Sequence, residues 1–368
     1  MHLTGLELIA LRDALRTAAT TGATSSRSAT AERWRVEASG WSAAIGSRRY
    51  GAPRNADPVR HTEATMLHQI SRAFVGHSPA FADVVGDAPR VERVVETDAH
   101  EGPVYVWTEH ALYFTTARPD VAIRRLALDG DQPGNERVTT VRARTRAANG
   151  MALGPDGRLL VCEQGSLDQP AAITAVSRAT GATETIVAGA RGLPLNSPND
   201  IVVAHDGAIW FTDPSYGFLQ GFRPPPALPD RLYRYDPATQ EMRVAADGFD
   251  KPNGLAFSPG GGTLYVGDNG APHHLLAYDV VDGRRLVGER VVGVTGPEHP
   301  DGIKVDRAGR IYASAPSGIQ VLAPTGERLG EIHLPGAMNF TFGGPAGNIL
   351  YITADTAIWA AFLKARGA

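Results

Sequence analysis

The fold is decided by a stretch that begins at residue 199 and reads NDIVVAHDGAIWF, ending at Phe211. A polar pair, Asn199-Asp200, leads into the apolar run 201–203, and Asp206-Gly207 separates that run from the second apolar run 209–211. β-Branched and aromatic residues are enriched in strands, and Asp-Gly is a frequent turn between antiparallel strands. The stretch therefore predicts a β-hairpin that is introduced by a polar residue.

The same arrangement recurs along the chain from residue 91 onward. A polar residue introduces each unit, and these residues, called anchors below, are Glu101, Asn149, Asn199, Asn253, Asp301 and, in a less regular sixth unit, Asn339. Successive anchors are separated by 48, 50, 54, 48 and 38 residues. A period of about 40 to 50 residues with two strong strands per unit is typical of the four-stranded blades of a β-propeller.

Weaker apolar runs at 172–176, 231–235 and 275–279 fit third strands of these blades. We therefore predict an all-β protein, with a six-bladed β-propeller over residues 89–368. Residues 1–88 are predicted to form a partly helical, partly flexible N-terminal extension, because apolar residues recur at helical spacing near Leu3–Leu15 and Met66–Val75. A parallel α/β fold is disfavoured, since no helical period separates the strands.

Composition narrows the classes of partner. The chain has 41 Gly and 26 Pro, as expected for many tight turns, and its only cysteine, Cys162, excludes an intrachain disulfide and a cysteine-based zinc cluster. A net charge of −3 gives no basic footprint for nucleic acid, and no apolar run approaches the roughly 20 residues of a membrane span. With no export signal in the sequence, we expect a cytoplasmic protein without nucleic-acid or membrane partners. A homodimer through the extension is a further hypothesis.

The anchors predict a shared site. The first strand of each propeller blade lines the central channel, so residues just before those strands meet at one mouth of the channel. Five anchors there, Glu101, Asn149, Asn199, Asn253 and Asp301, carry side-chain oxygens. Carboxylate and amide oxygens without His or Cys suit Ca²⁺, and Mg²⁺ or Mn²⁺ less well. A single Asn-Gly or Asp-Gly is an ordinary turn, but its repetition at one blade position indicates a divalent cation site.

The motifs around the anchors resemble the senescence marker protein/gluconolactonase family of calcium-dependent lactonases, also called regucalcin-like. The matching stretches are EGPV (101–104), SPND (197–200) with WFTDP (210–214), KPNGLAFS (251–258) and PDG (300–302). The resemblance implies that Glu101, Asn199, Asn253 and Asp301 bind one divalent metal ion, Ca²⁺ foremost, with Zn²⁺, Mn²⁺ and Mg²⁺ as the other options. It also implies that Asp301 is the catalytic acid/base residue. The extension has no counterpart in these motifs.

The expected reaction is hydrolysis of a small lactone, of a sugar acid or a related molecule. A central cation polarises the carbonyl and stabilises the oxyanion that water attack creates. A carboxylate must take the proton from the water, and Asp301 is the first choice and Asp200 the second. Asp200 could instead orient its neighbours. We expect Asn149, Asp200 and His299 to contact the substrate, and the insertion at 216–230 to form a lid.

Two other functions stay open at this point. Diisopropylfluorophosphatase-like propellers resemble the same ligand quartet, so hydrolysis of organophosphate triesters is an alternative reaction. A non-catalytic, calcium-binding propeller is the alternative from another functional class. Strictosidine-synthase-like propellers share the fold but lack the quartet, which argues against them.

Overall fold

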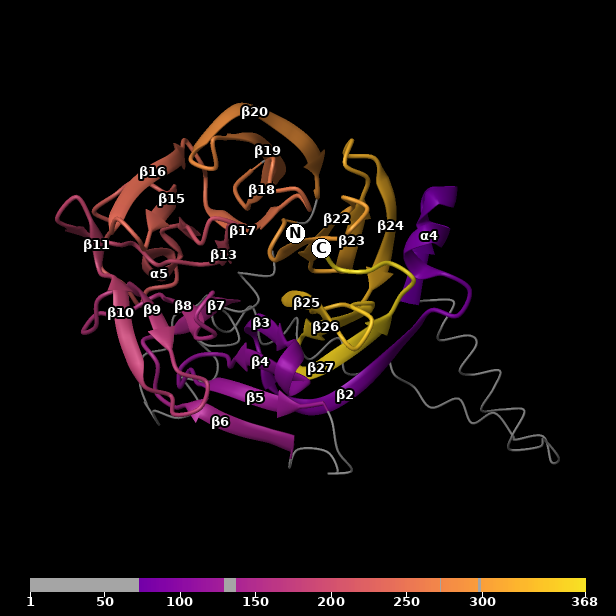
Figure 1. The fold of residues 1–368 in the computed structure, drawn as a ribbon, viewed down its shortest axis with the longest axis horizontal. Helices are drawn as coiled ribbons and strands as arrows, with labels where there is room; N and C mark the ends of the chain where they lie inside the picture. The colour runs from indigo at the N-terminus through magenta and orange to yellow at the C-terminus, as the bar shows by residue number, and fades with distance from the viewer. Residues whose placement is uncertain (1–72, 129–136, 272, 297–298) are drawn as a thin grey trace, which may run out of the picture. The chain divides into compact units, whose positions relative to one another are not determined.

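A computed structural model describes residues 73–128, 137–271, 273–296 and 299–368. These residues form six antiparallel sheets of at least four strands around a common axis, so the predicted six-bladed propeller is confirmed (Figure 1). Within this part of the chain, no helix has both the length and the apolar character needed to cross a membrane.

The first three blades follow the chain in order. Blade 1 consists of β3 (Glu101–Val106), β4 (Ala111–Thr115), β5 (Ile123–Ala127) and β6 (Val138–Arg142). Blade 2 consists of β7 (Ala148–Leu153), β8 (Leu159–Glu163), β9 (Ala172–Val176) and β10 (Thr183–Val187), and a small pair, β11 (Gly189–Ala190) with β12 (Leu193–Pro194), follows it. Blade 3 consists of β13 (Ile201–Val203), β14 (Ile209–Asp213), β15 (Arg231–Asp236) and β16 (Glu241–Asp247).

The last three blades draw partly on the start of the described chain. Blade 4 consists of β17 (Pro252–Phe257), β18 (Thr263–Asp268), β19 (His274–Val281) and β20 (Arg285–Val294). Blade 5 consists of β21 (Ile303–Val305), β22 (Ile311–Ala315), β23 (Gly318–Leu322) and β24 (Arg328–His333), with β1 (Phe74–Gly76) as a fifth strand. Blade 6 consists of β25 (Asn339–Gly343), β26 (Ile349–Thr353), β27 (Asp355–Phe362) and β2 (Arg90–Ala99).

Strand pairing between the two ends of the propeller sequence closes the ring of blades. Strand β2, which precedes blade 1 in the chain, pairs antiparallel with β27 as the outermost strand of blade 6. Val95 of β2 is buried with Tyr351 and Ile358, so apolar packing adds to the backbone hydrogen bonds of this seam. The first strands contact each other in the cyclic order β3, β7, β13, β17, β21, β25 and back to β3.

The described end of the N-terminal extension packs on the propeller. Phe74 and Val75, which the apolar spacing assigned to a helix, lie in strand β1 instead, because their backbone pairs with the edge of β24. A short 3₁₀-helix (Pro79–Phe81) and α4 (Ala82–Val85) follow, and they place Phe81 and Val84 in the apolar core of blades 5 and 6. The predicted helix near Leu3–Leu15 and the dimer hypothesis lie outside the described residues.

Glycines that follow the anchors let neighbouring first strands approach closely. A Cβ on Gly254 would lie 2.2 Å from the carbonyl oxygen of Asp301, and one on Gly302 would lie 2.3 Å from Oδ1 of Asn339. The N–H of Gly254 donates to the same Asp301 carbonyl at 3.0 Å. These dipeptides are therefore contacts between blades and not tight turns, whereas Asp206-Gly207 is a hairpin turn as predicted.

This crowding predicts that Gly254→Ala destabilises the propeller, by about 1–3 kcal/mol, because backbone atoms would have to move. Gly260→Ala is the matched control, since Gly260 is exposed in the β17–β18 turn and a Cβ there meets nothing within 4 Å. Urea denaturation of both variants measures the free energy of unfolding. Equal stability of the two variants would contradict the close approach at Gly254.

Candidate metal centre

The anchors gather at one end of the first strands. Five of them are at least nine-tenths buried, with exposed fractions of 5% for Glu101, 7% for Asn149, 7% for Asn199, 5% for Asn253 and 2% for Asn339. Nδ2 of Asn339 donates to Oε2 of Glu101 at 2.8 Å, and Nδ2 of Asn149 donates to the Asn199 carbonyl at 3.3 Å. Polar contacts therefore connect the anchors of adjoining blades. Asn339 was identified from the repeat as the sixth anchor but was not predicted to be a site residue. Its contact with Glu101 places it in the ring that the anchors form.

Hydroxyl groups at the ends of the second strands fix the anchor backbones. Thr212 donates to the carbonyl of Asn253 at 2.8 Å, and Thr115 donates to that of Asn149 at 3.3 Å, each reaching into the next blade. Thr353 donates to the Asn339 carbonyl at 3.0 Å within its own blade. We did not foresee these contacts, although a Thr or Ser at this strand position in four blades is a signal that the sequence contains.

Two acidic anchors bring like charges together. Burial raises the pKa of Asp301 well above its usual range, and the nearby charge of Glu101 raises it further. Burial also raises the pKa of Glu101, while His100 and a hydrogen bond from Asn339 oppose that rise. Ionisation of these two buried carboxyls therefore costs free energy, and a bound cation would lower that cost.

Asp200 contributes a third carboxyl with unused acceptor capacity. It is 3% exposed, and its Oδ1 accepts a hydrogen bond from the N–H of Ile201 at 2.9 Å. Its Oδ2 is buried and makes no hydrogen bond of good geometry to the described residues. Burial raises the pKa of Asp200, whereas Lys304 and backbone N–H groups lower it. A buried acceptor without a partner indicates that something other than these protein groups completes the site.

Histidines occupy the surroundings of the anchors. Nδ1 of His100 lies 2.7 Å from Oδ1 of Asp355, a pairing that sequence reasoning missed because the two residues are 255 positions apart. Burial lowers the pKa of His100, but Asp355, Glu101 and Asp301 together raise it above its ordinary value.

A second histidine lies beside His299, which was predicted to contact the substrate. The ring of His273 lies 5.6 Å from that of His299, so the structure adds His273 to the histidines near the anchors.

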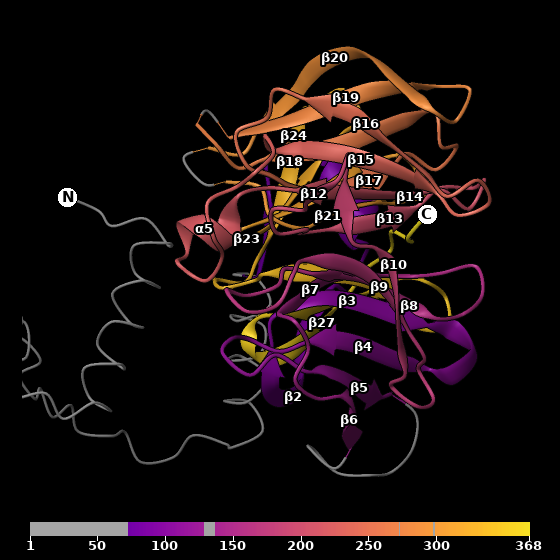
Figure 2. The same cartoon turned by 90° about the vertical axis from the view of Figure 1, so that its left-hand side faces the viewer.

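The segment 216–230 begins with the short helix α5 (Tyr216–Leu219), which Figure 2 shows at one edge of the ring of sheets. Arg223 anchors this segment: its guanidinium donates to the carbonyls of Ser166, Gln169, Leu195 and Asn196 at 2.9–3.0 Å. The expected lid is therefore tied to the β8–β9 loop of blade 2 and to the connection between blades 2 and 3. Its first residue, Tyr216, is buried beside Asn253.

Amide oxygens are essential to any metal site in this ring. Among the residues that the structure describes, no group of three or more His, Cys, Asp or Glu side chains could hold a metal ion. Glu101 and Asp301 supply two carboxylates, and Asn199 and Asn253 would supply neutral oxygens. This all-oxygen set fits a hard cation and gives no thiolate or imidazole to a soft one.

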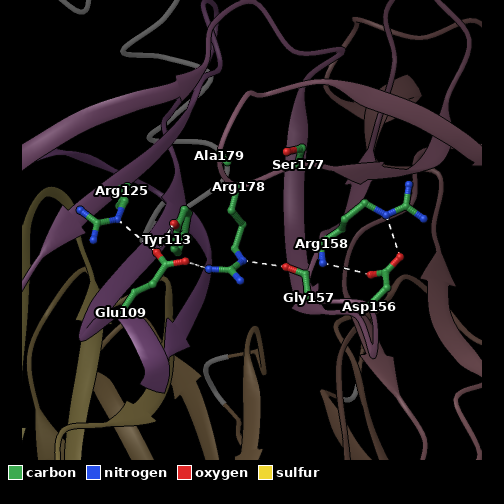
Figure 3. A pocket seen from close by; sticks show the side chains of 9 residues that line it. All are labelled: Glu109, Tyr113, Arg125, Asp156, Gly157, Arg158, Ser177, Arg178 and Ala179. Carbon is green, nitrogen blue, oxygen red and sulfur yellow. Dashed lines mark hydrogen bonds and ion pairs between the residues drawn. The ribbon is translucent and has the colours of Figure 1, made fainter.

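A separate cavity of about 430 Å³ lies at the other ends of the strands (Figure 3). It is lined by the β3–β4 connection and by the turns that follow β7 and β9, whereas the anchors lie in the first two positions of the first strands or just before these strands. Its arginines are occupied by nearby carboxylates: Arg178 and Arg125 pair with Glu109, and Arg158 pairs with Asp156. This cavity is thus distinct from the ring of anchors.

The fold and the polar channel mouth define the class of protein, a six-bladed propeller with a buried acidic centre. The chain belongs to the SMP-30/gluconolactonase/LRE-like family, whose model matches residues 99–356, so the resemblance read from the motifs is confirmed. A gluconolactonase of Zymomonas mobilis is 31% identical over 299 residues, which cover 74% of this chain and 81% of that protein. The lactonohydrolase oryL of Aspergillus oryzae is 30% identical, with 73% and 68% covered.

A solved structure shows the same architecture. The gluconolactonase from Xanthomonas campestris aligns with a TM-score of 0.69 and 31% sequence identity, covering 87% of this chain and 99% of that one.

The raised pKa of Asp301 predicts how stability depends on pH when metal is chelated. The unfolded carboxyl, with a pKa near 3.8, loses its proton before the folded one does as pH rises. The free energy of unfolding of the wild type should therefore fall relative to Asp301→Asn from about pH 4 upward, by about 1.4 kcal/mol per unit of pKa shift, until the folded carboxyl ionises. Urea denaturation with EDTA at several pH values checks this. The prediction would be contradicted if the free energy of unfolding of the wild type stayed constant or rose relative to that of Asp301→Asn over this pH range.

Proposed function

We propose that this protein is a hydrolase that opens the ring of a small lactone at the ring of anchors. The observation that carries the proposal is the buried acidic centre, in which the charges of Glu101 and Asp200 both raise the pKa of Asp301, and in which Oδ2 of Asp200 is buried without a hydrogen bond of good geometry. Membership of a family with gluconolactonase and lactonohydrolase relatives supports a lactone as the substrate.

The centre fits a divalent cation. Glu101, Asn199, Asn253 and Asp301 would hold it, and an all-oxygen set with two carboxylates favours Ca²⁺ over softer ions. When bound, such a cation supplies polarisation of the substrate carbonyl and stabilisation of the negative charge that develops on its oxygen. The mutual repulsion of the two buried carboxylates supports the same assignment.

The remaining steps belong to the side chains. Asp301 accepts the proton of the attacking water, since burial and the charge of Glu101 raise the pKa of this carboxyl and make it a stronger base than an ordinary aspartate. Asp200, with its unused Oδ2, is the second candidate for this role. Asn149 donates its Nδ2 to the Asn199 carbonyl, which leaves its Oδ1 to accept from a substrate hydroxyl. His299 contacts the substrate from the channel mouth.

Removal of metal tests the proposal. EDTA should abolish hydrolysis of gluconolactone and lower the melting temperature, and added Ca²⁺ should restore both, because a ligand present at 100 times its Kd stabilises the native state by about 2.7 kcal/mol. The measurements are pH-stat titration of the acid released and thermal denaturation. Activity and melting temperature that ignore chelation would refute the metal-dependent mechanism.

Substitution of Asp301 tests whether this residue is needed for hydrolysis. Asp301→Asn should lower kcat/KM for the lactone by about 10²- to 10⁴-fold, the usual contribution of a general base. Asp282→Asn is the control, because it removes the same charge from a side chain that is 79% exposed.

Faster hydrolysis of diisopropyl fluorophosphate than of lactones by the wild type would favour the organophosphate alternative. Binding of Ca²⁺ without any hydrolysis would favour a non-catalytic propeller.

A further inference from the structure

An asparagine ligand has a problem that a carboxylate ligand lacks. Both oxygens of Glu101 or Asp301 can face a cation, but the amide of Asn253 has one accepting end, Oδ1, and one donating end, Nδ2. A half-turn of the amide would present N–H hydrogens to the cation and repel it. Some neighbour must therefore select one orientation if the function proposed above, on which this inference rests, is correct.

Tyr216 is placed to make that selection. Nδ2 of Asn253 lies 3.3 Å from the hydroxyl of Tyr216, and the same hydroxyl lies 3.4 Å from the carbonyl oxygen of Lys251. A carbonyl oxygen can only accept, so the single hydrogen of the hydroxyl is directed to Lys251. The hydroxyl oxygen then accepts from Asn253, and only Nδ2 can donate to it.

The rest of the Asn253 amide agrees with this direction. Among the described residues, no hydrogen bond involves Oδ1 of Asn253. Nδ2 thus has a protein partner, and the accepting end is left for a ligand.

We propose that Tyr216 is a positioning residue that fixes the amide of Asn253 with Oδ1 available to the cation. Tyr216 touches neither the cation nor the reacting atoms in this role. It acts through the chain of hydrogen bonds from Asn253 to its own hydroxyl and on to the Lys251 carbonyl.

The hydroxyl can act in this way because Tyr216 is itself immobilised. It is 5% exposed, and the N–H of the next residue, Gly217, donates to the hydroxyl of Ser197 at 2.9 Å. The backbone N–H groups of Phe222 and Arg223 both donate to the Gly217 carbonyl, at 2.9 and 3.0 Å. A Cβ on Gly217 would lie 2.2 Å from Cγ of Arg223, so the segment folds back tightly on itself. Arg223 then ties it to two carbonyls of the β8–β9 loop in blade 2 and to two carbonyls between β12 and β13.

The test is the affinity of the full-length protein for Ca²⁺, measured by isothermal titration calorimetry after removal of metal. Tyr216→Phe deletes only the hydroxyl and should raise the Kd for Ca²⁺ about five- to tenfold, the usual effect of losing one hydrogen bond. The value of kcat at saturating Ca²⁺ should change less than the Kd, because the ligand set itself is intact.

Tyr312→Phe is the matched control. Tyr312 is another buried tyrosine, and its hydroxyl donates to Oδ2 of Asp306 at 3.0 Å. This variant should lose stability in EDTA at least as much as Tyr216→Phe does, yet keep the wild-type Kd for Ca²⁺. Equal Kd values for wild type and Tyr216→Phe would overturn the positioning role, as would an equal rise of Kd in both variants.

A double variant distinguishes orientation of the amide from a general effect of the hydroxyl. In Asn253→Asp the ligand has two accepting oxygens and no orientation to select, so adding Tyr216→Phe should change the Kd less than twofold. An undiminished five- to tenfold effect in that background would overturn the proposal. If the wild type shows neither calorimetric heat nor a rise in melting temperature with Ca²⁺, both the proposed function and the positioning role of Tyr216 are refuted. If the wild type binds Ca²⁺ but the Kd values of the variants differ from those expected, only the positioning role is refuted.

Discussion

The close approach of six first strands around one axis is the constraint on which the rest of this structure depends. After four of the anchors the chain has glycine, and at each of these glycines a Cβ would lie within 2.6 Å of an atom of the next anchor. The anchor backbones are therefore in contact from blade to blade, and the hydroxyls of Thr115 and Thr212 strengthen the same contacts. The side chains of the anchors are therefore held in this crowded centre.

Crowding at the axis also explains the electrostatics of the site. Glu101, Asp200 and Asp301 are brought together by the ring and not by local sequence, and their burial raises the pKa of each carboxyl. An apolar side chain would pack more easily at such a place, so the presence of three acids near this buried centre indicates a function that needs negative charge. The surrounding amides reduce the cost, since Asn339 donates directly to Glu101.

Much of the fold was predictable because each blade repeats a local pattern. The alternation of apolar residues located first, second and third strands such as β13, β14 and β15, and the spacing of the anchors gave the number of blades. The closure of blade 6 by β2 was not predictable in this way, because β2 pairs with a strand more than 250 residues away. The same holds for β1, whose Phe74 and Val75 resembled part of a helix until β24 offered a free edge.

The sequence by itself determined the propeller, its family and the residues that begin each blade, because these depend on short-range periodicity and recurring motifs. Only the tertiary structure decided which groups act on those residues. His100 meets Asp355, Asn339 meets Glu101, and Tyr216 meets Asn253 across distances of 37 to 255 positions in the chain. No local pattern encodes such pairs, since they arise when the ring closes and brings the loops of different blades to one mouth of the channel.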